Sequence, residues 1–443
     1  MADETDILIV GAGAAGLAAA RELSSANYNV IVLEARDRIG GRIHTHFGPQ
    51  LPAPIELGAE FVHGEAPETL QLVKRAGLKL LQLPNTHWYL RNALISKSGE
   101  FWSNIEAINH EMERYHGSDE SFGQFLDEYS RKHQIEDIRA IATLYVEGFH
   151  AAHADRISVP GLIKTNEAAA EIDDDKQFRP ANGYLPLMQF LHDEAVAHGA
   201  SFRFEKIVSE FAWRAGAVVV TTTTGEQFKA RRLIVTLPLG VLQRKDVTFA
   251  PRLTAKEEAA NKLAVGQVVK VVLRFRERFW EQISLPSADG ERVDLKELAF
   301  LHAPDEMPPT WWTQLPVRAP LLVGWAGGTR AEQLLSQTAS EIGSDALREK
   351  CVEALSHIFA EPVAVIEALL VDFYTHDWAT DPFSLGAYSY IPVGGLKAEA
   401  ALAEPVENTI YFAGEATNKK GHQGTVHGAL ATGLRAARLI RQS

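Results

Sequence analysis

Cysteine is almost absent from this sequence, with one residue, Cys351, among 443. A single cysteine forms no disulfide within the chain and supplies no CxxC pair, which excludes the disulfide-reductase class of redox proteins. The helically spaced apolar residues around Cys351 predict that it is buried. No block of Lys or Arg is long enough for a nucleic-acid surface, and the formal net charge is −13. This acidic balance argues against a nucleic-acid partner and favours cationic small molecules.

Long hydrophobic runs are also missing. The uncharged stretch 7–20 is interrupted by glycine and is shorter than the roughly 20 apolar residues of a membrane span. Residues 1–6 are acidic and lack the positive region of a secretory signal. We therefore expect a cytoplasmic protein without a membrane partner. The share of hydrophobic residues (46%) and charged residues (23%) is typical of globular chains, and 443 residues suffice for two domains.

The N-terminus carries a dinucleotide-binding pattern. The β-rich run Ile7–Val10 leads into the glycine-rich turn at residues 11–16, and a helical pattern follows. Glycines in such a turn let a pyrophosphate approach the backbone at the N-terminus of the helix. Glu34 ends the next predicted strand, close to the roughly 20-residue offset of an acid that accepts from a ribose hydroxyl. The spacing predicts a bound dinucleotide.

A second glycine pair distinguishes FAD from NAD. Gly40-Gly41-Arg42 follows Glu34 and suits additional phosphate and ribityl contacts on a larger cofactor, which NAD sites usually lack. Together with Ile43-His44-Thr45, these motifs resemble the FAD-binding opening of the flavin-containing amine oxidases. The resemblance covers nearly the whole chain, and the wording Thr-Val-His-Gly-Ala-Leu at 425–430 is similar to polyamine oxidases and histone lysine demethylases.

The resemblance implies an FAD that is held without a covalent bond. Monoamine oxidases tether their flavin through a cysteine immediately before an active-site tyrosine, and here that position is Ala387. A helix that begins near residue 425 would direct its N-terminus at the flavin N1 and C2 carbonyl. The expected cofactor contacts are Gly11, Gly13, Ala15, Gly16, Glu34, Ala35, Arg36, Gly41, Arg42, Gly58, Ala59, Glu60, Phe61, Val208, Trp378, Gly414, Glu415, Thr425 and Val426.

Lys270 is the candidate catalytic residue. The strand pattern 267–275 places Lys270 between Val268 and Val272 on one face, and places the other apolar residues on the opposite face. An edge strand whose lysine reaches water is an alternative from the residues alone. Matching segments of amine oxidases carry a lysine that holds a water against flavin N5. The resemblance therefore implies that Lys270 assists flavin reoxidation or imine hydrolysis.

Three further residues are expected at the substrate. The resemblance implies that Tyr388 forms one wall beside the flavin and guides an amine toward it. Thr425 falls where monoamine oxidases carry a second cage tyrosine, so that only half of the cage is aromatic. His63 matches a site histidine of animal polyamine and spermine oxidases, with a structural role as the alternative. His150 and His153 lack a third ligand at suitable spacing, and we expect no metal site.

The predicted fold is α/β. A Rossmann-like FAD-binding domain is interleaved with an α+β substrate domain, whose mixed sheet is flanked by helices. We assign residues 1–78, 179–250 and 395–443 to the FAD-binding domain, and residues 79–178 and 251–394 to the substrate domain. The oligomeric state is left open, a homodimer included.

The resemblance also implies a reaction. A hydride passes from the α-carbon of an amine to flavin N5, the imine is hydrolysed to an aldehyde or ketone, and O2 is reduced to H2O2. His63, Thr425 and the acidic charge favour a polyamine or a related amine. Alternatives are a monoamine oxidase, an L-amino-acid oxidase, for which the sequence does not identify a carboxylate-binding arginine, and, in another class, an FAD-binding scaffold without amine turnover.

Overall fold

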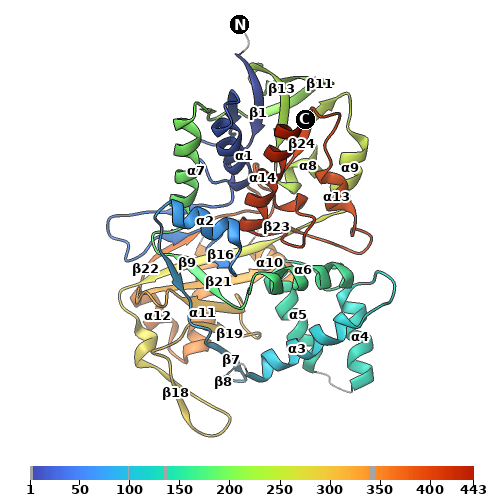
Figure 1. The fold of residues 1–443 in the computed structure, drawn as a ribbon. Helices are drawn as coiled ribbons and strands as arrows, with labels where there is room; N and C mark the ends of the chain where they lie inside the picture. The colour runs from blue at the N-terminus through green and yellow to red at the C-terminus, as the bar shows by residue number, and fades with distance from the viewer. Residues whose placement is uncertain (1–2, 98, 134–136, 339–344) are drawn as a thin grey trace.

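The chain forms two stacked lobes, with both termini in the upper lobe (Figure 1). The computed structural model describes residues 3–97, 99–133, 137–338 and 345–443. Within these residues the upper lobe is built on an eight-stranded sheet and the lower lobe on a seven-stranded sheet. The α/β prediction is confirmed. No helix in the described ranges is both long and apolar enough to cross a membrane.

The upper sheet is a mostly parallel sheet with the predicted Rossmann-like core. Its strands lie in the order β10-β2-β1-β13-β12-β11-β14, and β24 pairs with β13. Strands β10, β2, β1, β13 and β24 run parallel, which brings their carboxyl ends to one edge. The strands are β1 (Asp3–Val10), β2 (Val30–Leu33), β10 (Ser201–Arg203), β11 (Val208–Arg214), β12 (Ala217–Thr222), β13 (Gln227–Val235), β14 (Thr248–Ala250) and β24 (Ile410–Phe412).

Helices cover both faces of this sheet. Alternation along β1 directs Ile7 and Ile9 to one face and Leu8 and Val10 to the other, so each face meets its own hydrophobic cluster. On the first face lie α1 (Ala14–Ser25), α2 (Pro67–Arg75), α7 (Leu185–Ala197) and α14 (Val426–Gln442). On the second face lie α8 (Leu239–Arg244), α9 (Thr254–Asn261) and α13 (Ala398–Ala403).

The lower sheet places Lys270 in an interior strand. Its order is β22-β16-β21-β20-β19-β7-β8, and Lys270 lies on β16, which pairs with β21 and β22. The alternative of an edge strand is therefore wrong. Val269, Val271 and the next two alternate residues share one apolar cluster, as predicted. The strands are β7 (His87–Arg91), β8 (Leu94–Lys97), β16 (Val268–Phe275), β19 (Phe300–His302), β20 (Thr310–Thr313), β21 (Leu321–Gly327) and β22 (Leu370–Thr375).

Two groups of helices flank the lower sheet (Figure 1). The apolar face of β16 packs on α10 (Gly328–Gln337), α11 (Asp345–Phe359) and α12 (Val363–Leu369). Beside the sheet lie α3 (Gly99–Glu113), α4 (Phe122–His133), α5 (Asp137–His150) and α6 (Val159–Glu171). Cys351 is buried in α11, as predicted.

The other elements are short. The strands β5 (Val62–His63), β9 (Gln177–Pro180) and β6 (Leu80–Gln82) form one small sheet. The remaining elements are β3 (Thr45–His46), β4 (Ile55–Glu56), β15 (Ala264–Gly266), β17 (Ser284–Pro286), β18 (Arg292–Asp294), β23 (Tyr388–Tyr390), and the 3₁₀ turns η1 (Phe279–Gln282) and η2 (Glu415–Thr417). The chain crosses between the sheets several times, and the domain boundaries given above stay a prediction.

The close crossing of α1 and α14 depends on Gly433. A Cβ at Gly433 would lie 2.1 Å from the Ala15 carbonyl oxygen, so Gly433→Ala must push the helices apart. We expect a loss of about 1–3 kcal/mol in the free energy of unfolding, measured by denaturant titration. Gly148→Ala is the matched control, because a Cβ at this glycine of α5 meets no atom within 4 Å. The control gains about 0.5–1 kcal/mol, and equal effects of the two substitutions would contradict the packing argument.

Candidate active site and cofactor cavity

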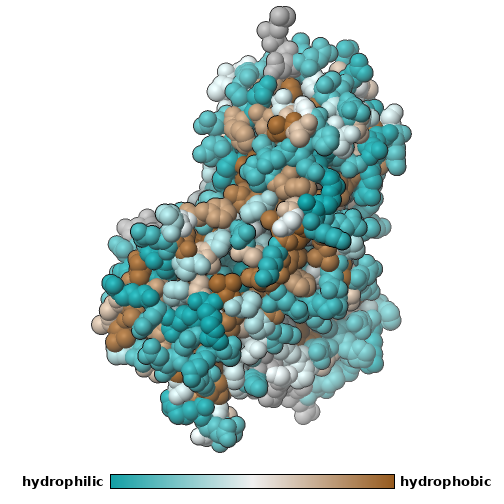
Figure 2. Space-filling view, turned by 60° about the vertical axis from the view of Figure 1, so that its left-hand side comes forward, coloured by the Kyte–Doolittle hydropathy of each residue, from teal (hydrophilic) through white to brown (hydrophobic). Residues whose placement is uncertain are grey.

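A single continuous cavity joins the two lobes. Its volume is about 1430 Å³, and it runs from Gly13 in the upper lobe past Arg42 to Lys270 and Trp325 in the lower lobe. This exceeds the roughly 300–1,000 Å³ of a typical ligand pocket, which leaves room for a large cofactor and a second molecule. Of the predicted site residues, all but Gly16 line it. On the face shown in Figure 2, hydrophobic residues gather around a hollow between the lobes.

The glycines of the turn after β1 have two roles: two allow close packing, and one borders the open cavity. A Cβ at Gly16 would lie 1.9 Å from the Gly11 carbonyl oxygen, and one at Gly11 would lie 2.4 Å from the Thr236 hydroxyl. These two glycines let the turn pack on α1 and β13. A Cβ at Gly13, the N-cap of α1, would meet no atom within 4 Å. The open space therefore lies directly before the free amides of the α1 N-terminus, where a pyrophosphate binds.

Glu34 supports the same turn from the end of β2. Its carboxylate accepts hydrogen bonds from the backbone N–H groups of Ala12 (2.7 Å) and Arg36 (2.9 Å). Burial raises the pKa of Glu34, against the lowering effect of these two amides. Each carboxylate oxygen accepts more than one hydrogen bond, so the expected ribose contact is compatible with this support. Ala35 lies next to Glu34 on the cavity wall.

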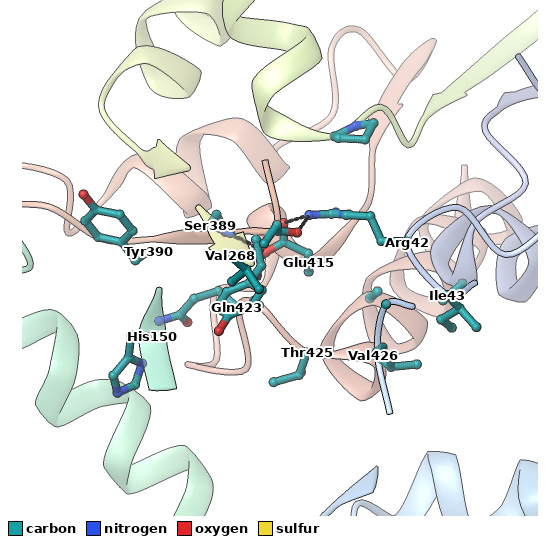
Figure 3. A pocket seen from close by; sticks show the side chains of 18 of the residues that line it. Arg42, Ile43, His150, Val268, Ser389, Tyr390, Glu415, Gln423, Thr425 and Val426 are labelled. Atoms are coloured by element: carbon teal, nitrogen blue, oxygen red, sulfur yellow. Dashed lines mark hydrogen bonds and ion pairs between the residues drawn. The ribbon is translucent and has the colours of Figure 1, made fainter. Parts of the chain in front are cut away.

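Two arginines connect the N-terminal segment to the C-terminal third of the chain. Arg36 donates to both carboxylate oxygens of Asp381. Arg42 donates to the Ala387 carbonyl (2.6 Å) and to Glu415 (3.0 Å), and Figure 3 shows this pair at the cavity. The other Glu415 oxygen accepts from the backbone N–H and the hydroxyl of Ser389. These bonds hold together cavity walls that come from distant parts of the sequence.

The N-terminus of α14 faces the cavity at its middle, where Thr425 and Val426 lie side by side (Figure 3). The Thr425 hydroxyl accepts from the Gly428 N–H (3.0 Å) and donates to the His422 carbonyl (2.8 Å). It is thus engaged as the helix N-cap, and its oxygen keeps one lone pair with which it can accept a hydrogen bond from the substrate. The uncapped amides of the first turn make the site attractive to a partial negative charge on a bound ring.

Aromatic side chains form the walls around the middle of the cavity. Trp378 donates its indole N–H to the Leu57 carbonyl (2.9 Å), which fixes its ring against Gly58. Tyr388 donates its hydroxyl to the Phe149 carbonyl (2.8 Å), and burial raises the pKa of this tyrosine. Cys351 does not line the cavity, so a thioether bond to a flavin is excluded.

Lys270 is 3% exposed and is held in a dense polar cluster. Its ammonium donates to Glu60 Oε2 (2.6 Å) and to the Gly58 carbonyl (3.1 Å), and it lies 5.8 Å from the centre of the Trp312 ring. Arg179 donates to the other oxygen of Glu60 (2.8 Å). The carboxylate of Glu60 therefore accepts hydrogen bonds from two cations. Its contact with the cofactor stays a prediction.

A histidine and aspartate wall lines another part of the cavity. His63 Nδ1 and Asp174 Oδ1 lie 3.4 Å apart, without hydrogen-bond geometry. His427 is 8% exposed, and its ring lies 4.7 Å from that of His422. Burial, reinforced by His422 and His63, lowers the pKa of His427 to about 3, so its imidazole is neutral. Residues 173–175, all aspartates, line this wall.

Sequence reasoning missed several of these residues. Arg179 and Trp312 were not predicted to belong to the site, because their position beside Glu60 depends on contacts between strands far apart in the sequence. A buried lysine needs a counter-ion, which was a signal that some acid lies beside Lys270. The run of aspartates at 173–175 was a visible signal for the acidic wall, and His427 stood within a motif that was interpreted as a helix start and a family resemblance without a role for the histidine.

Comparisons with known proteins agree with this geometry. A family model described as "Flavin containing amine oxidoreductase" matches residues 14–441. Polyamine oxidase 4 of Oryza sativa subsp. japonica is 29% identical over 479 residues, covering 98% of this chain and 88% of that protein. Putrescine oxidase in a structure bound to putrescine has a TM-score of 0.80 at 21% identity, covering 100% of both chains. Cyclohexylamine oxidase from Brevibacterium oxydans IH-35A has a TM-score of 0.77 at 21% identity, covering 99% of both chains. At these identities the two structures show a shared fold.

The buried carboxyl of Glu56 makes stability depend on pH. Glu56 accepts from the Thr45 hydroxyl (2.9 Å) and the Tyr184 backbone N–H (2.5 Å), and burial raises its pKa to about 7. The folded state thus keeps a proton that the unfolded chain loses near its ordinary pKa of 4.5, and this carboxyl lowers stability as pH rises between the two values.

Glu56→Gln removes this titration. Relative to wild type, the variant gains stability as pH rises from about 5 to 8, by at most about 3 kcal/mol, with the difference constant above the folded-state pKa. Denaturant titrations of both proteins across this range measure the difference. A difference that is the same at every pH would contradict the assignment to Glu56.

Proposed function

The chain belongs to the family of flavin-containing amine oxidoreductases, and from that premise we propose that its substrate is a polyamine or a related amine with a second positive charge. The protein is an FAD-dependent amine oxidase. Bound FAD supplies the acceptor for a hydride equivalent from the amine α-carbon, and O2 takes up the electrons as hydrogen peroxide. Water hydrolyses the imine product to an aldehyde or ketone.

The upper lobe offers one position for each part of FAD. The open space at Gly13 before α1 would take the pyrophosphate, and Glu34 would accept from the adenosine ribose. Arg42 adds a positive charge beside the cavity, and the N-terminus of α14 would face the ring. With Cys351 buried elsewhere, the cofactor is held without a covalent bond.

The observation that carries the proposal is a set of three buried polar atoms with no hydrogen-bond partner in the described part of the chain. They are His63 Nδ1, Asp174 Oδ1 and His427 Nε2, and all three residues line the cavity. Leaving such atoms unpaired is unfavourable, and a ligand that donates hydrogen bonds relieves it. An ammonium group has three N–H donors and a charge that Asp174 complements.

This wall lies apart from the reacting end of the cavity. The Phe61 ring lies 6.2 Å from the His63 ring and 5.5 Å from the Trp312 ring, and Trp312 in turn lies beside Lys270. Phe61 thus stands between the two groups, and an amine that reacts near Lys270 could meet the acidic wall with a second amino group further along its chain. Diamines and polyamines have this form. A polyamine oxidase among the relatives and a putrescine-bound structure among the neighbours support the same choice.

An amino acid fits the cavity less well. Its carboxylate needs a free arginine, but Arg36 and Arg42 belong to the cofactor end and are paired with Asp381 and Glu415. Arg179 near the reacting end is committed to Glu60. These three arginines are therefore occupied, whereas the groups without a hydrogen bond at the acidic wall suit a cation.

An amine panel tests the proposed function. The holoenzyme is mixed with spermine, spermidine, putrescine, benzylamine and an L-amino acid, and peroxide release is measured for each. We expect release with at least one of the three amines that carry more than one amino group, and a lower KM for it than for benzylamine. Turnover of benzylamine or the amino acid with no response to any polyamine would overturn the proposal.

Asp174→Asn tests the role of the acidic wall. Loss of the charge should raise KM for a diamine or polyamine about tenfold, equivalent to about 1.4 kcal/mol, with little change in kcat. KM for a monoamine should stay as in wild type. Asp173→Asn is the matched control, because Asp173 pairs with Lys176 (2.7 Å), and it should change KM less. An equal rise of KM for both substrate classes in the Asp174 variant would contradict the assignment.

A further inference from the structure

The three N–H groups of the Lys270 ammonium are used unequally. Two point to acceptors in the protein, Glu60 Oε2 at 2.6 Å and the Gly58 carbonyl at 3.1 Å. The third has no acceptor among the described residues, and Lys270 lines the cavity. A ligand or a water in the cavity can therefore accept a hydrogen bond from this lysine. Whether Lys270 can also take a proton from that ligand depends on whether its side chain is an ammonium or a neutral amine.

Glu60 is held in place by contacts that do not involve Lys270. Its Oε1 accepts from Arg179 Nε (3.0 Å) and Nη2 (2.8 Å), and from the Trp312 indole N–H (3.2 Å). Burial works to raise the pKa of Glu60, but Lys270 and Arg179 outweigh it and lower the value to about 2. The carboxylate is thus charged at neutral pH, and its Oε2 is directed at Lys270.

Arg179 is in turn anchored independently of Lys270. Its Nη1 donates to the carbonyls of Gln314 (3.1 Å) and Leu315 (3.0 Å), which follow β20. The cluster of Lys270, Arg179 and Glu60 therefore contains two cations and one anion. All three side chains are buried, with exposures of 2%, 8% and 4%. These three side chains alone leave one net positive charge, and the Glu56 carboxyl, which interacts electrostatically with Lys270 and Glu60 and whose pKa burial raises to about 7, is the further titratable group near them.

We propose that Glu60 is a positioning residue that keeps Lys270 an ammonium and directs its free N–H into the cavity. Lys270 then acts as a hydrogen-bond donor and a fixed cation, and does not take a proton from the substrate. In a buried site an unpaired lysine loses its proton far more readily than in water, so the acid is what maintains this state. The inference rests on the amine oxidase activity, but not on which amine is oxidised.

The test follows the reaction of the reduced holoenzyme with O2. The flavin is reduced with dithionite, so the measurement needs no amine substrate. The wild-type rate between about pH 6 and 9 is the reference profile, which includes any contribution from Glu56, whose pKa burial raises to about 7. Glu60→Gln should add a loss of rate on the alkaline side of this range, as Lys270 deprotonates. The double variant Glu60→Gln/Lys270→Arg should lose the added pH dependence, because a guanidinium stays protonated.

Thermal unfolding supplies a readout independent of activity. In Glu60→Gln, folded Lys270 binds fewer protons than the unfolded chain, so Tm should rise with pH up to the ordinary lysine pKa of about 10.4. The double variant should show a lower Tm than wild type without this rise. A purely structural role of Glu60 would lower Tm and rate equally at every pH, with no rescue by arginine, and this result would overturn the proposal.

Wild type provides a test that does not require any Glu60 variant to fold. If its rate of reoxidation or its flavin absorption spectrum titrates below about pH 9, and Lys270→Arg abolishes that titration, Lys270 is deprotonated in the native site and the proposal is wrong. Absence of the titration supports it. If no polyamine is turned over in the amine panel but these pH profiles are observed, the proposed substrate class is wrong and the role of Glu60 is still supported.

Discussion

The ion pair between Lys270 and Glu60 joins the two lobes at the point where they share a site. Glu60 lies between the short strands β4 and β5, whereas Lys270 lies in the middle of the lower sheet. Arg42 and Glu415 join distant segments in the same manner. A cavity of this size has no side chains at its centre, so close apolar packing cannot hold its walls together. Directional, charge-assisted hydrogen bonds across the rim do this instead.

The two walls of the cavity carry opposite charge. At the lower sheet, Lys270 and Arg179 outnumber Glu60 and leave a net positive charge. At the other wall, Asp174 adds negative charge and His427 is neutral. An amine must enter the positive end without its own charge, which is also the form that can give up a hydride. A second amino group keeps its proton at the negative wall, so one molecule satisfies both ends.

Local patterns were sufficient for the parts of the site that local structure builds. The glycine turn at 11–16 and Glu34 are set by a strand, a turn and a helix in sequence, and their arrangement could be predicted. The apolar neighbours of Lys270 left an edge strand open, and the family resemblance was what favoured a buried lysine. The partners of Lys270 could not be predicted, because they depend on register between strands. The N-cap role of Thr425 is local, and a threonine at the predicted helix start was a signal for it. The strand expected to carry Val208 was placed correctly as a cavity wall, but its contact with a ligand stays a prediction.

The stability of the fold does not explain why three charged side chains are buried at this position. Taking Lys270, Arg179 and Glu60 out of water is unfavourable, and replacing a buried ion cluster by apolar side chains of similar volume is often neutral or stabilising by about 1–4 kcal/mol. Valines and leucines occupy most neighbouring positions on β16, so the sheet itself does not require a lysine. What an apolar residue cannot supply is an N–H donor and a fixed charge at the cavity wall. Glu60 is then the group proposed to keep that donor protonated, and Arg179 holds Glu60 in place.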